Sequence, residues 1–85
     1  MQNPITASVG ERGVNHAQDV GIVQYLLNRA NAKRGVPKAQ IDVDGIVGPQ
    51  TLNALKEFQT KFCKTVDGIV NPNSETLTML HQVAG

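Results

Sequence analysis

The sequence contains no tryptophan, one tyrosine, two phenylalanines and a single cysteine. Because Cys63 is alone, a disulfide within the chain is excluded, and we expect this thiol to be a small, partly buried packing residue. Long apolar runs are also missing, since no stretch approaches the roughly 20 residues that cross a bilayer. Residues 1–10 have neither a cationic start nor an apolar segment. The sequence therefore predicts no membrane span and no signal peptide.

An excess of charge of one sign is lacking as well. Eight Lys and Arg residues stand against seven Asp and Glu residues, which gives a formal net charge of +1 at pH 7. This balance gives no electrostatic reason to expect binding to nucleic acid or to an anionic membrane. Apolar residues make up 40% of the chain and charged residues only 18%, which favours a globular domain over a disordered one. A length of 85 residues fits one domain.

What the chain does contain is an internal repeat. Residues 43–47 and 66–70 both read Val-Asp-Gly-Ile-Val. Each copy runs on to a proline and then to a Thr-Leu pair, at 49, 51 and 52 in the first copy and at 72, 76 and 77 in the second. In so short a chain, such a repeat indicates a small duplicated supersecondary unit.

The apolar periodicity predicts three helices. The first runs from Asp19, as N-cap, to about residue 32, and the second covers about 49–63 with Pro49 in its first turn. The third starts at Pro72 with Asn73 or Ser74 as its cap. Their apolar faces consist of Val20, Val23, Leu26, Leu27 and Ala30; of Leu52, Leu55, Phe58 and Phe62; and of Leu77, Leu80, Val83 and Ala84.

Together these features predict an all-α fold, a compact three-helix bundle with two Asp-Gly turn loops that come from a duplicated helix-loop unit. Residues 1–18 show no sustained periodicity, so we expect an irregular N-terminal arm before a domain over 19–85. The Val-Asp-Gly-Ile-Val segments are too short to build a sheet and are expected to make at most a one-bridge contact.

Two buried amides are predicted to tie the helices to the loops. Gly45 and Gly68 are suited to positive φ, and the carboxylates of Asp44 and Asp67 can accept hydrogen bonds from amides just beyond them. The two amides are those of Gln24 and Gln59, which fall on or beside the apolar faces of their helices. A buried amide without partners costs about 1–3 kcal/mol, so we expect each to bond the backbone of the neighbouring loop.

Metal sites are not expected. A calcium loop of the EF-hand type centred on Gly45 lacks its first carboxylate and its bidentate glutamate, and the register on Gly68 fits less well. Zinc would need three or four clustered ligands, whereas the only His and Cys residues are isolated at positions 16, 63 and 81. We therefore expect no metal and no cofactor.

No catalytic constellation is evident either. A pair formed by a cysteine and a histidine could meet only in space, and nothing suggests a lowered pKa for Cys63. Asp44 and Asp67 sit in matching turn contexts, which gives no basis for separate acid and base roles. The sequence predicts a protein that is not an enzyme.

The order of these motifs resembles the peptidoglycan-binding domain of the three-helix type, a small module of bacterial and phage cell-wall hydrolases. The resemblance covers residues 19 to 80. Its residues are Asp19-Val20, Val23-Gln24, Leu26-Leu27-Asn28, Val43 to Pro49, Thr51-Leu52, Ala54-Leu55, Phe58-Gln59, Val66 to Val70, Thr76-Leu77 and Leu80. One departure is that Asn71 stands where the first copy has Gly48, followed by two additional residues, so the two loops need not present equivalent surfaces.

The resemblance implies a module that binds peptidoglycan, through its glycan strand or its stem peptide, without cleaving it. Such a module would target a cell-wall hydrolase, a lysin or an antibacterial toxin to murein. The implied location is the bacterial periplasm or cell wall. Without a signal peptide, this location would be reached by leaderless export, phage lysis or specialised secretion, or the chain would be an excised domain.

Polar side chains near the turns and on the first helix are candidate ligand contacts. Tyr25 lies about 140° from Val20 around the helix, and Arg29 follows one turn later, so an aromatic face and a guanidinium are presented together. The alternative for Tyr25 is packing against the arm. The other candidates form a polar rim of short side chains: Asn28, Asp44, Gln50, Asn71 and Asn73.

A second function is compatible with the same scaffold, because a fold does not determine a function. In this alternative the domain is a protein–protein adaptor without wall affinity. An adaptor would expose an apolar patch, and Ile22 and Met79 lie off the main apolar faces.

Overall fold

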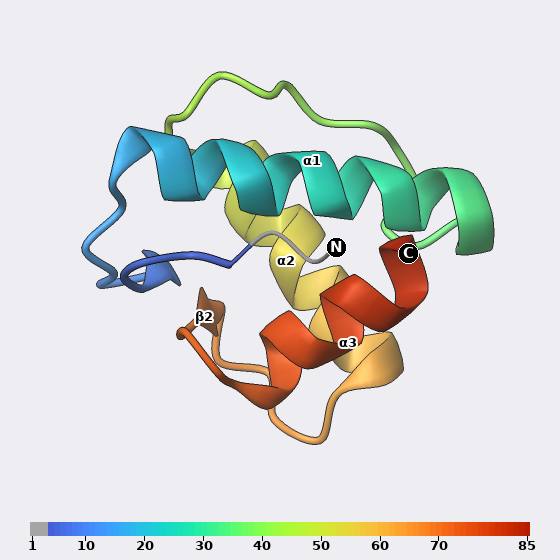
Figure 1. Ribbon diagram of the computed structural model, residues 1–85. Coiled ribbons are helices and arrows are strands. Elements are labelled where there is room, and N and C mark those ends of the chain that lie inside the picture. Colours follow the sequence, from blue (N-terminus) through green and yellow to red (C-terminus); the bar gives the residue numbers. More distant parts are fainter. Residues whose placement is uncertain (1–3) are drawn as a thin grey trace.

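The computed structural model describes residues 4–85. It contains strand β1 (Val9–Gly10), helix α1 (Ala17–Arg34), helix α2 (Pro49–Phe62), strand β2 (Ile69–Val70) and helix α3 (Glu75–Ala84), in that order (Figure 1). The prediction of an all-α fold with three helices is confirmed, with one two-stranded sheet of minimal length added. Within the described residues, no helix combines the length and the apolarity that crossing a membrane requires.

Helix α1 begins earlier than the sequence suggests. Its N-cap is His16, which makes no side-chain capping bond, and Asp19 lies inside the first turn. The expectation that Asp19 caps the helix is therefore wrong, although a carboxylate in the first turn still favours the helix dipole. The helix ends at Gly35, which adopts a left-handed conformation with φ of 69° and donates its N–H to the carbonyl of Asn31.

The other two helices start close to the predicted positions. Pro49 occupies the first turn of α2, where its missing N–H costs nothing. Helix α3 is capped by Ser74, whose hydroxyl accepts from the backbone N–H of Leu77 at 3.3 Å. Pro72 lies before this helix and not in it, because Asn73 has a φ of 58° and redirects the chain.

The core is formed where α1 crosses the other helices. Figure 1 shows α1 across one side of the molecule, with α2 and α3 beneath it and the connection 35–48 passing back along its other side. Leu52 and Phe62 are only half-buried. The other residues predicted for the apolar faces are buried: Val20, Val23, Leu26, Leu27, Ala30, Leu55, Phe58, Leu77, Leu80, Val83 and Ala84.

The N-terminal arm contributes to this core. Residues 1–3 of the predicted irregular arm lie outside the described residues. Among residues 4–18, Val9 and Gly10 form β1 and pair antiparallel with Val70 and Ile69 of the second repeat. Val9 and Val70 are fully buried, and Ile5 is nearly so. The second repeat thus pairs with the arm and not with the first repeat.

Asp19 holds the arm against α1. Its carboxylate accepts hydrogen bonds from the N–H of Thr6 at 3.0 Å, the hydroxyl of Thr6 at 2.7 Å and the N–H of Ala7 at 3.1 Å. The side chain is buried, so these bonds replace lost water contacts. Burial acts to raise the pKa of Asp19, but the bonds from Thr6 and Ala7, helped by nearby His16, hold that pKa below its usual value.

Replacing Asp19→Asn should loosen the arm. The change places an NH2 group where carboxylate oxygens now accept hydrogen bonds, so we expect the free energy of unfolding at pH 7 to fall by about 1–3 kcal/mol. A carboxyl whose pKa is depressed in the folded state stabilises the fold above its unfolded pKa of about 3.9, and this stabilisation is lost as the pH falls through the folded pKa. Urea denaturation should show the difference from the wild type closing below about pH 4.

Asp42→Asn is the matched control, because this carboxyl is exposed and accepts no hydrogen bond from residues 4–85. Its unfolding free energy at pH 7 should stay within about 0.5 kcal/mol of the wild type. A stability difference for Asp19→Asn that persists unchanged at about pH 3 would contradict the role of the ionised carboxylate.

Both Asp-Gly turns place glycine at positive φ, with 76° at Gly45 and 72° at Gly68. The substitutions Gly45→Val and Gly68→Val should each lower the free energy of unfolding by at least about 1 kcal/mol, because β-branched residues avoid this conformation. Gly21→Ala is the control, since a Cβ there meets no atom within 4 Å and should stabilise α1 by about 0.5–1 kcal/mol. Unchanged thermal midpoints for both valine variants would refute the turn geometry.

Candidate functional site

The first Asp-Gly loop is held by the side chain of Gln24 on α1. The Oε1 atom of Gln24 accepts from the backbone N–H groups of Asp44 and Gly45, both at 3.0 Å. Its Nε2 atom donates to the carboxylate of Asp44 at 2.9 Å, the carbonyl of Ile46 at 3.0 Å and the hydroxyl of Thr51 at 3.0 Å. Gln24 is 1% exposed, so one buried amide connects α1, the loop and the start of α2.

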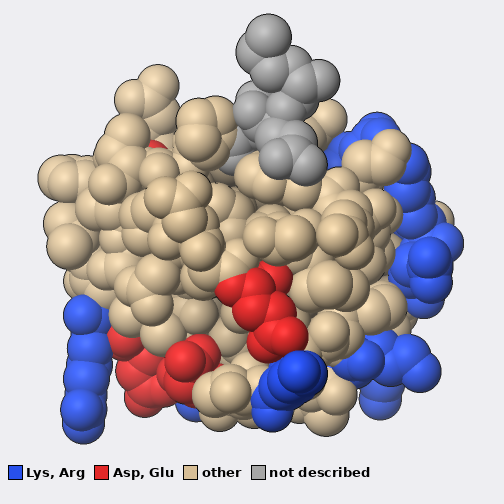
Figure 2. Space-filling model, turned by 60° about the horizontal axis from the view of Figure 1, so that its bottom comes forward, with Lys and Arg blue, Asp and Glu red and all other residues tan. Residues whose placement is uncertain are grey.

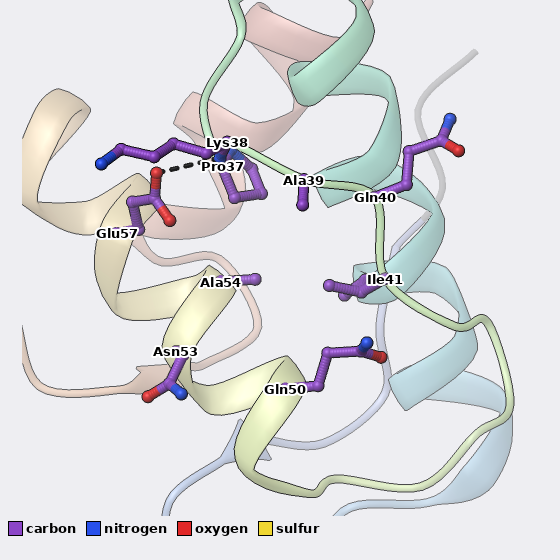
Figure 3. Close-up of a pocket in the computed structure, with 9 residues that line it drawn as sticks. All are labelled: Pro37, Lys38, Ala39, Gln40, Ile41, Gln50, Asn53, Ala54 and Glu57. Carbon is purple, nitrogen blue, oxygen red and sulfur yellow. Dashed lines mark hydrogen bonds between the residues drawn. The ribbon is translucent and has the colours of Figure 1, made fainter.

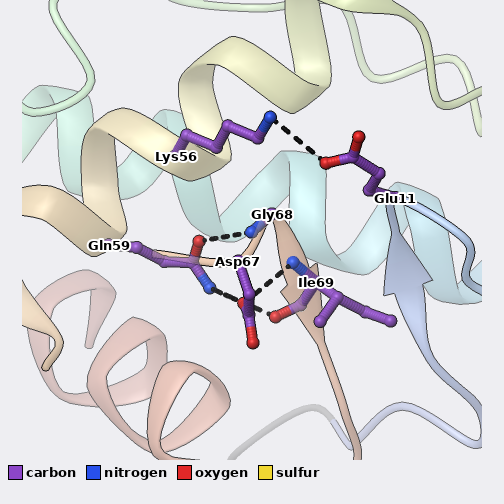
Figure 4. A network of polar contacts seen from close by, with 6 residues as sticks. All are labelled: Glu11, Lys56, Gln59, Asp67, Gly68 and Ile69. Carbon is purple, nitrogen blue, oxygen red and sulfur yellow. Dashed lines mark hydrogen bonds and ion pairs between the residues drawn. The ribbon is translucent and has the colours of Figure 1, made fainter. Parts of the chain in front are cut away.

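The second loop is held in the same way by Gln59 on α2 (Figure 4). The Oε1 atom of Gln59 accepts from the N–H of Gly68 at 2.9 Å. Its Nε2 atom donates to the carboxylate of Asp67 at 2.9 Å, the carbonyl of Ile69 at 3.2 Å and the hydroxyl of Thr76 at 3.1 Å. Gln59 is fully buried. The two repeats therefore make matching bonds at matching positions.

The two loop aspartates face their own turns. Asp44 accepts from the N–H of Ile46 at 3.0 Å, and Asp67 accepts from the N–H of Ile69 at 3.2 Å. The hydrogen bond from Gln24, followed by that from Ile46, lowers the pKa of Asp44. Since these oxygens close the turns, Asp44 has a structural role in addition to its predicted place on the polar rim.

Helix α1 fastens the connection 35–48 along its length. The side chain of Asn28 donates to the carbonyl of Ile41 and accepts from its N–H, both at 2.8 Å. The side chain of Asn31 donates to the carbonyl of Pro37 at 2.8 Å. With Gln24, these amides lie four and three residues apart and so form one stripe of the helix. Sequence reasoning missed Asn31, although its spacing from Asn28 is a visible signal.

A hollow of about 230 Å³ lies between this connection and α2 (Figure 3). Two bonds close its ends, from the N–H of Lys38 to the carboxylate of Glu57 and from the N–H of Asp42 to Oε1 of Gln50, both at 2.9 Å. Between them, the peptide groups of residues 39 and 40 bond to no other described residue. The hollow is lined by Pro37, Lys38, Ala39, Gln40, Ile41, Gln50, Asn53, Ala54 and Glu57.

The interior of this hollow is small and apolar. In Figure 3 the side chains of Ala54 and Ile41 point toward each other across it, and the methyl group of Ala39 points into it. Methyl groups beside polar and charged side chains are a common lining of ligand sites, so this hollow is a candidate binding site.

The remaining candidate residues lie elsewhere. Tyr25 is 48% exposed on α1, and Nε of Arg29 donates to the carbonyl of Ala84 at 3.3 Å. Asn71 and Asn73 are exposed before α3, where Asn73 borders a second hollow beside Leu77 and Thr78. The structure thus brings Asn28, Asp44 and Gln50 to the connection 35–48, and it places the other four outside that group.

Reactive groups are not concentrated in the part of the chain that the structure describes. Residues 4–85 hold no group of three His, Cys, Asp or Glu side chains that could share a metal ion. Cys63 packs partly buried against the core, as the sequence predicts, and burial raises the pKa of its thiol. Figure 2 shows Lys and Arg toward the edges of one face with Asp and Glu between them, so this face has no broad area of one charge.

Removing a glutamine amide should release its loop. Gln59→Leu replaces the amide by an apolar side chain of similar size, which leaves the buried N–H of Gly68 without a partner. We expect the free energy of unfolding to fall by at least about 2 kcal/mol, measured by urea denaturation. Gln82→Leu, on the exposed side of α3, should change it by no more than about 0.5 kcal/mol. Equal losses for the two variants would contradict the tether.

Comparison with known proteins bears on this arrangement. The family described as "Putative peptidoglycan binding domain" matches residues 16–80, which include all three helix starts and both glutamine-held loops. No curated protein and no solved structure matches the chain. Because the family match spans well over half of the sequence, this chain belongs to that peptidoglycan-binding domain family.

Proposed function

We propose that this protein binds the bacterial cell wall as a non-catalytic module and tethers a cell-wall hydrolase, lysin or toxin to murein. Peptidoglycan is the ligand that membership of the family implies. Tethering raises the effective concentration of a linked catalytic unit, so a weak contact with the wall has a large effect on activity. The site of action would be the periplasm or the cell wall itself.

The observation that carries the proposal is the hollow between the connection 35–48 and α2. Peptidoglycan is rich in methyl groups next to amides, in its acetamido sugars and in the alanines of its stem peptides. The methyl groups of Ala39 and Ala54 offer such a unit an apolar contact. In this proposal the peptide groups of residues 39 and 40, which bond to no other described residue, supply the hydrogen bonds. The bonds to Glu57 and Gln50 keep the hollow preformed, which reduces the entropic cost of binding.

The polar residues outside the hollow supply further contacts in this proposal. Tyr25 presents an aromatic side chain that is half exposed, and Asn71 and Asn73 present amides at the start of α3. A polymer as long as a glycan strand can reach several of these positions at once. Asn28, Arg29 and Asp44 act mainly by holding the backbone that shapes the surface.

The adaptor alternative receives less support from the surface. Ile22 and Met79 are partly buried and pack against the core, so they do not form an exposed patch. Among the described residues, the large apolar side chains that are exposed are Val14, Tyr25, Val43, Ile46 and Val66, of which only Val43 and Ile46 come from the same loop.

Binding to insoluble sacculi at low salt tests the proposal. The wild-type chain should sediment with the sacculi, and Ala39→Phe should weaken this binding by about tenfold, because the larger side chain fills the hollow. Ala32→Phe is the matched control, since Ala32 is exposed near the end of α1 and away from the hollow. If the wild type stays wholly in the supernatant, the proposed function is wrong.

A smaller effect is expected from Tyr25→Ala. Loss of its exposed ring should reduce sacculus binding by about threefold while the thermal midpoint stays unchanged. Reduced binding without destabilisation would place the wall contact on α1 as well. Full binding by both Ala39→Phe and Tyr25→Ala, in a chain that does sediment, would show that the polymer contacts another surface.

A further inference from the structure

The edge of the second loop already has an occupant, which is the chain's own arm. Strand β1 lies antiparallel to β2, with Gly10 opposite Ile69, and the N–H of Glu11 donates to the carbonyl of Gly68 at 2.8 Å. Gly68 is buried as a result, and Ile69 is half-buried. The second copy of Val-Asp-Gly-Ile-Val therefore shows that this turn can bind an extended segment through its backbone.

The first loop presents the same edge without an occupant. Ile46 and Val47 correspond to Ile69 and Val70 in the repeat, yet no strand among residues 4–85 pairs with them. The carbonyl of Gly45 and the N–H of Val47 make no hydrogen bond within the described residues. The side chain of Ile46 is 67% exposed, which agrees with an uncovered edge.

The helix residues next to the two turns differ, and a Cβ on Gly45 would lie 3.1 Å from the carbonyl oxygen of Ala17. Lys56 lies three residues before Gln59. Its side chain reaches the second turn, because its Cε atom lies 2.8 Å from the position that a Cβ on Gly68 would occupy. Lys56 also pairs with the arm through Glu11 at 3.2 Å. The residue three positions before Gln24 is Gly21, and a Cβ built there meets no atom within 4 Å.

The conformation of the arm indicates what kind of peptide fits such an edge. Gly10, opposite Ile69, has a φ of 124°, a region that L-residues rarely adopt. A Cβ of L configuration at Gly10 would collide with the carbonyl oxygen of Gly68. A D-residue reaches positive φ without strain, because it is the mirror image of an L-residue, and its Cβ points to the other side of the backbone.

We propose that the edge of the first loop, residues 45–47, binds a short extended peptide that places a small D-residue opposite Ile46. The inference rests on the proposed function, because the stem peptides of peptidoglycan contain D-alanine. Backbone hydrogen bonds from Gly45 and Val47 give affinity, and the requirement for positive φ selects against an all-L peptide. The site is distinct from the hollow that contains Ala39.

The test uses two substitutions at Val47 in the full chain. Val47→Pro removes the N–H that the bound peptide would accept from, so sacculus binding should fall by about fivefold or more. Val47→Ala keeps this N–H, loses at least as much packing against the core, and should bind like the wild type. Thermal midpoints of the two variants separate a loss of binding from unfolding, and equal binding by both would overturn the inference.

A soluble probe tests the chirality directly on the wild-type chain. Titration with acetyl-L-lysyl-D-alanyl-D-alanine should shift the backbone amide resonances of Ile46 and Val47, and the all-L isomer at equal concentration should not. Equal shifts with both isomers, or shifts confined to residues around Ala39, would overturn the inference. Concentration-dependent dimerisation that Val47→Pro abolishes would also overturn it, by showing that the arm of a second copy occupies the edge.

Failure of this inference can be separated from failure of the proposed function. If the wild type, Val47→Ala and Val47→Pro all sediment equally with sacculi, the chain binds the wall by another surface and only the peptide edge is wrong. If none of them sediments, the proposed function is wrong.

Discussion

A buried amide at a helix face is the interaction on which the rest of the structure depends. Gln24 and Gln59 each bond to a turn and to the first residues of the next helix, so helix, loop and helix are fixed by one side chain. Apolar packing alone would leave the direction of each loop undetermined, because the hydrophobic effect is non-directional. The amides add the direction, and both candidate ligand surfaces lie on backbone that they or the neighbouring asparagines hold in place.

The sequence predicted those parts of the structure that depend on residues close together in the chain. Apolar spacing located all three helices, and Pro49 marked a boundary that the structure retains. It was less informative where a residue finds its partner far away. Asp19 resembles an N-cap, but its carboxylate bonds residues 12 and 13 positions earlier, which no local pattern could indicate. The same limit applies to the hollow, because Glu57 reaches back 19 residues to Lys38.

The two repeats share a sequence but differ in their surroundings. The arm covers the second turn, and it does so with residues that precede the region matched by the family. The first turn has no paired strand among residues 4–85. Two identical pentapeptides therefore have different surroundings in one small domain, one paired with the arm and the other without a paired strand.

The separation of the tethers along the chain has a consequence for folding order. Gln59 closes a segment of 8 residues to Asp67, whereas Gln24 closes one of 20 residues to Asp44. The entropy of loop closure favours the shorter segment by about 0.8 kcal/mol, so the C-terminal unit can assemble early and offer a surface on which the rest of the chain condenses. A nascent chain would then complete its N-terminal unit only after its last helix is available.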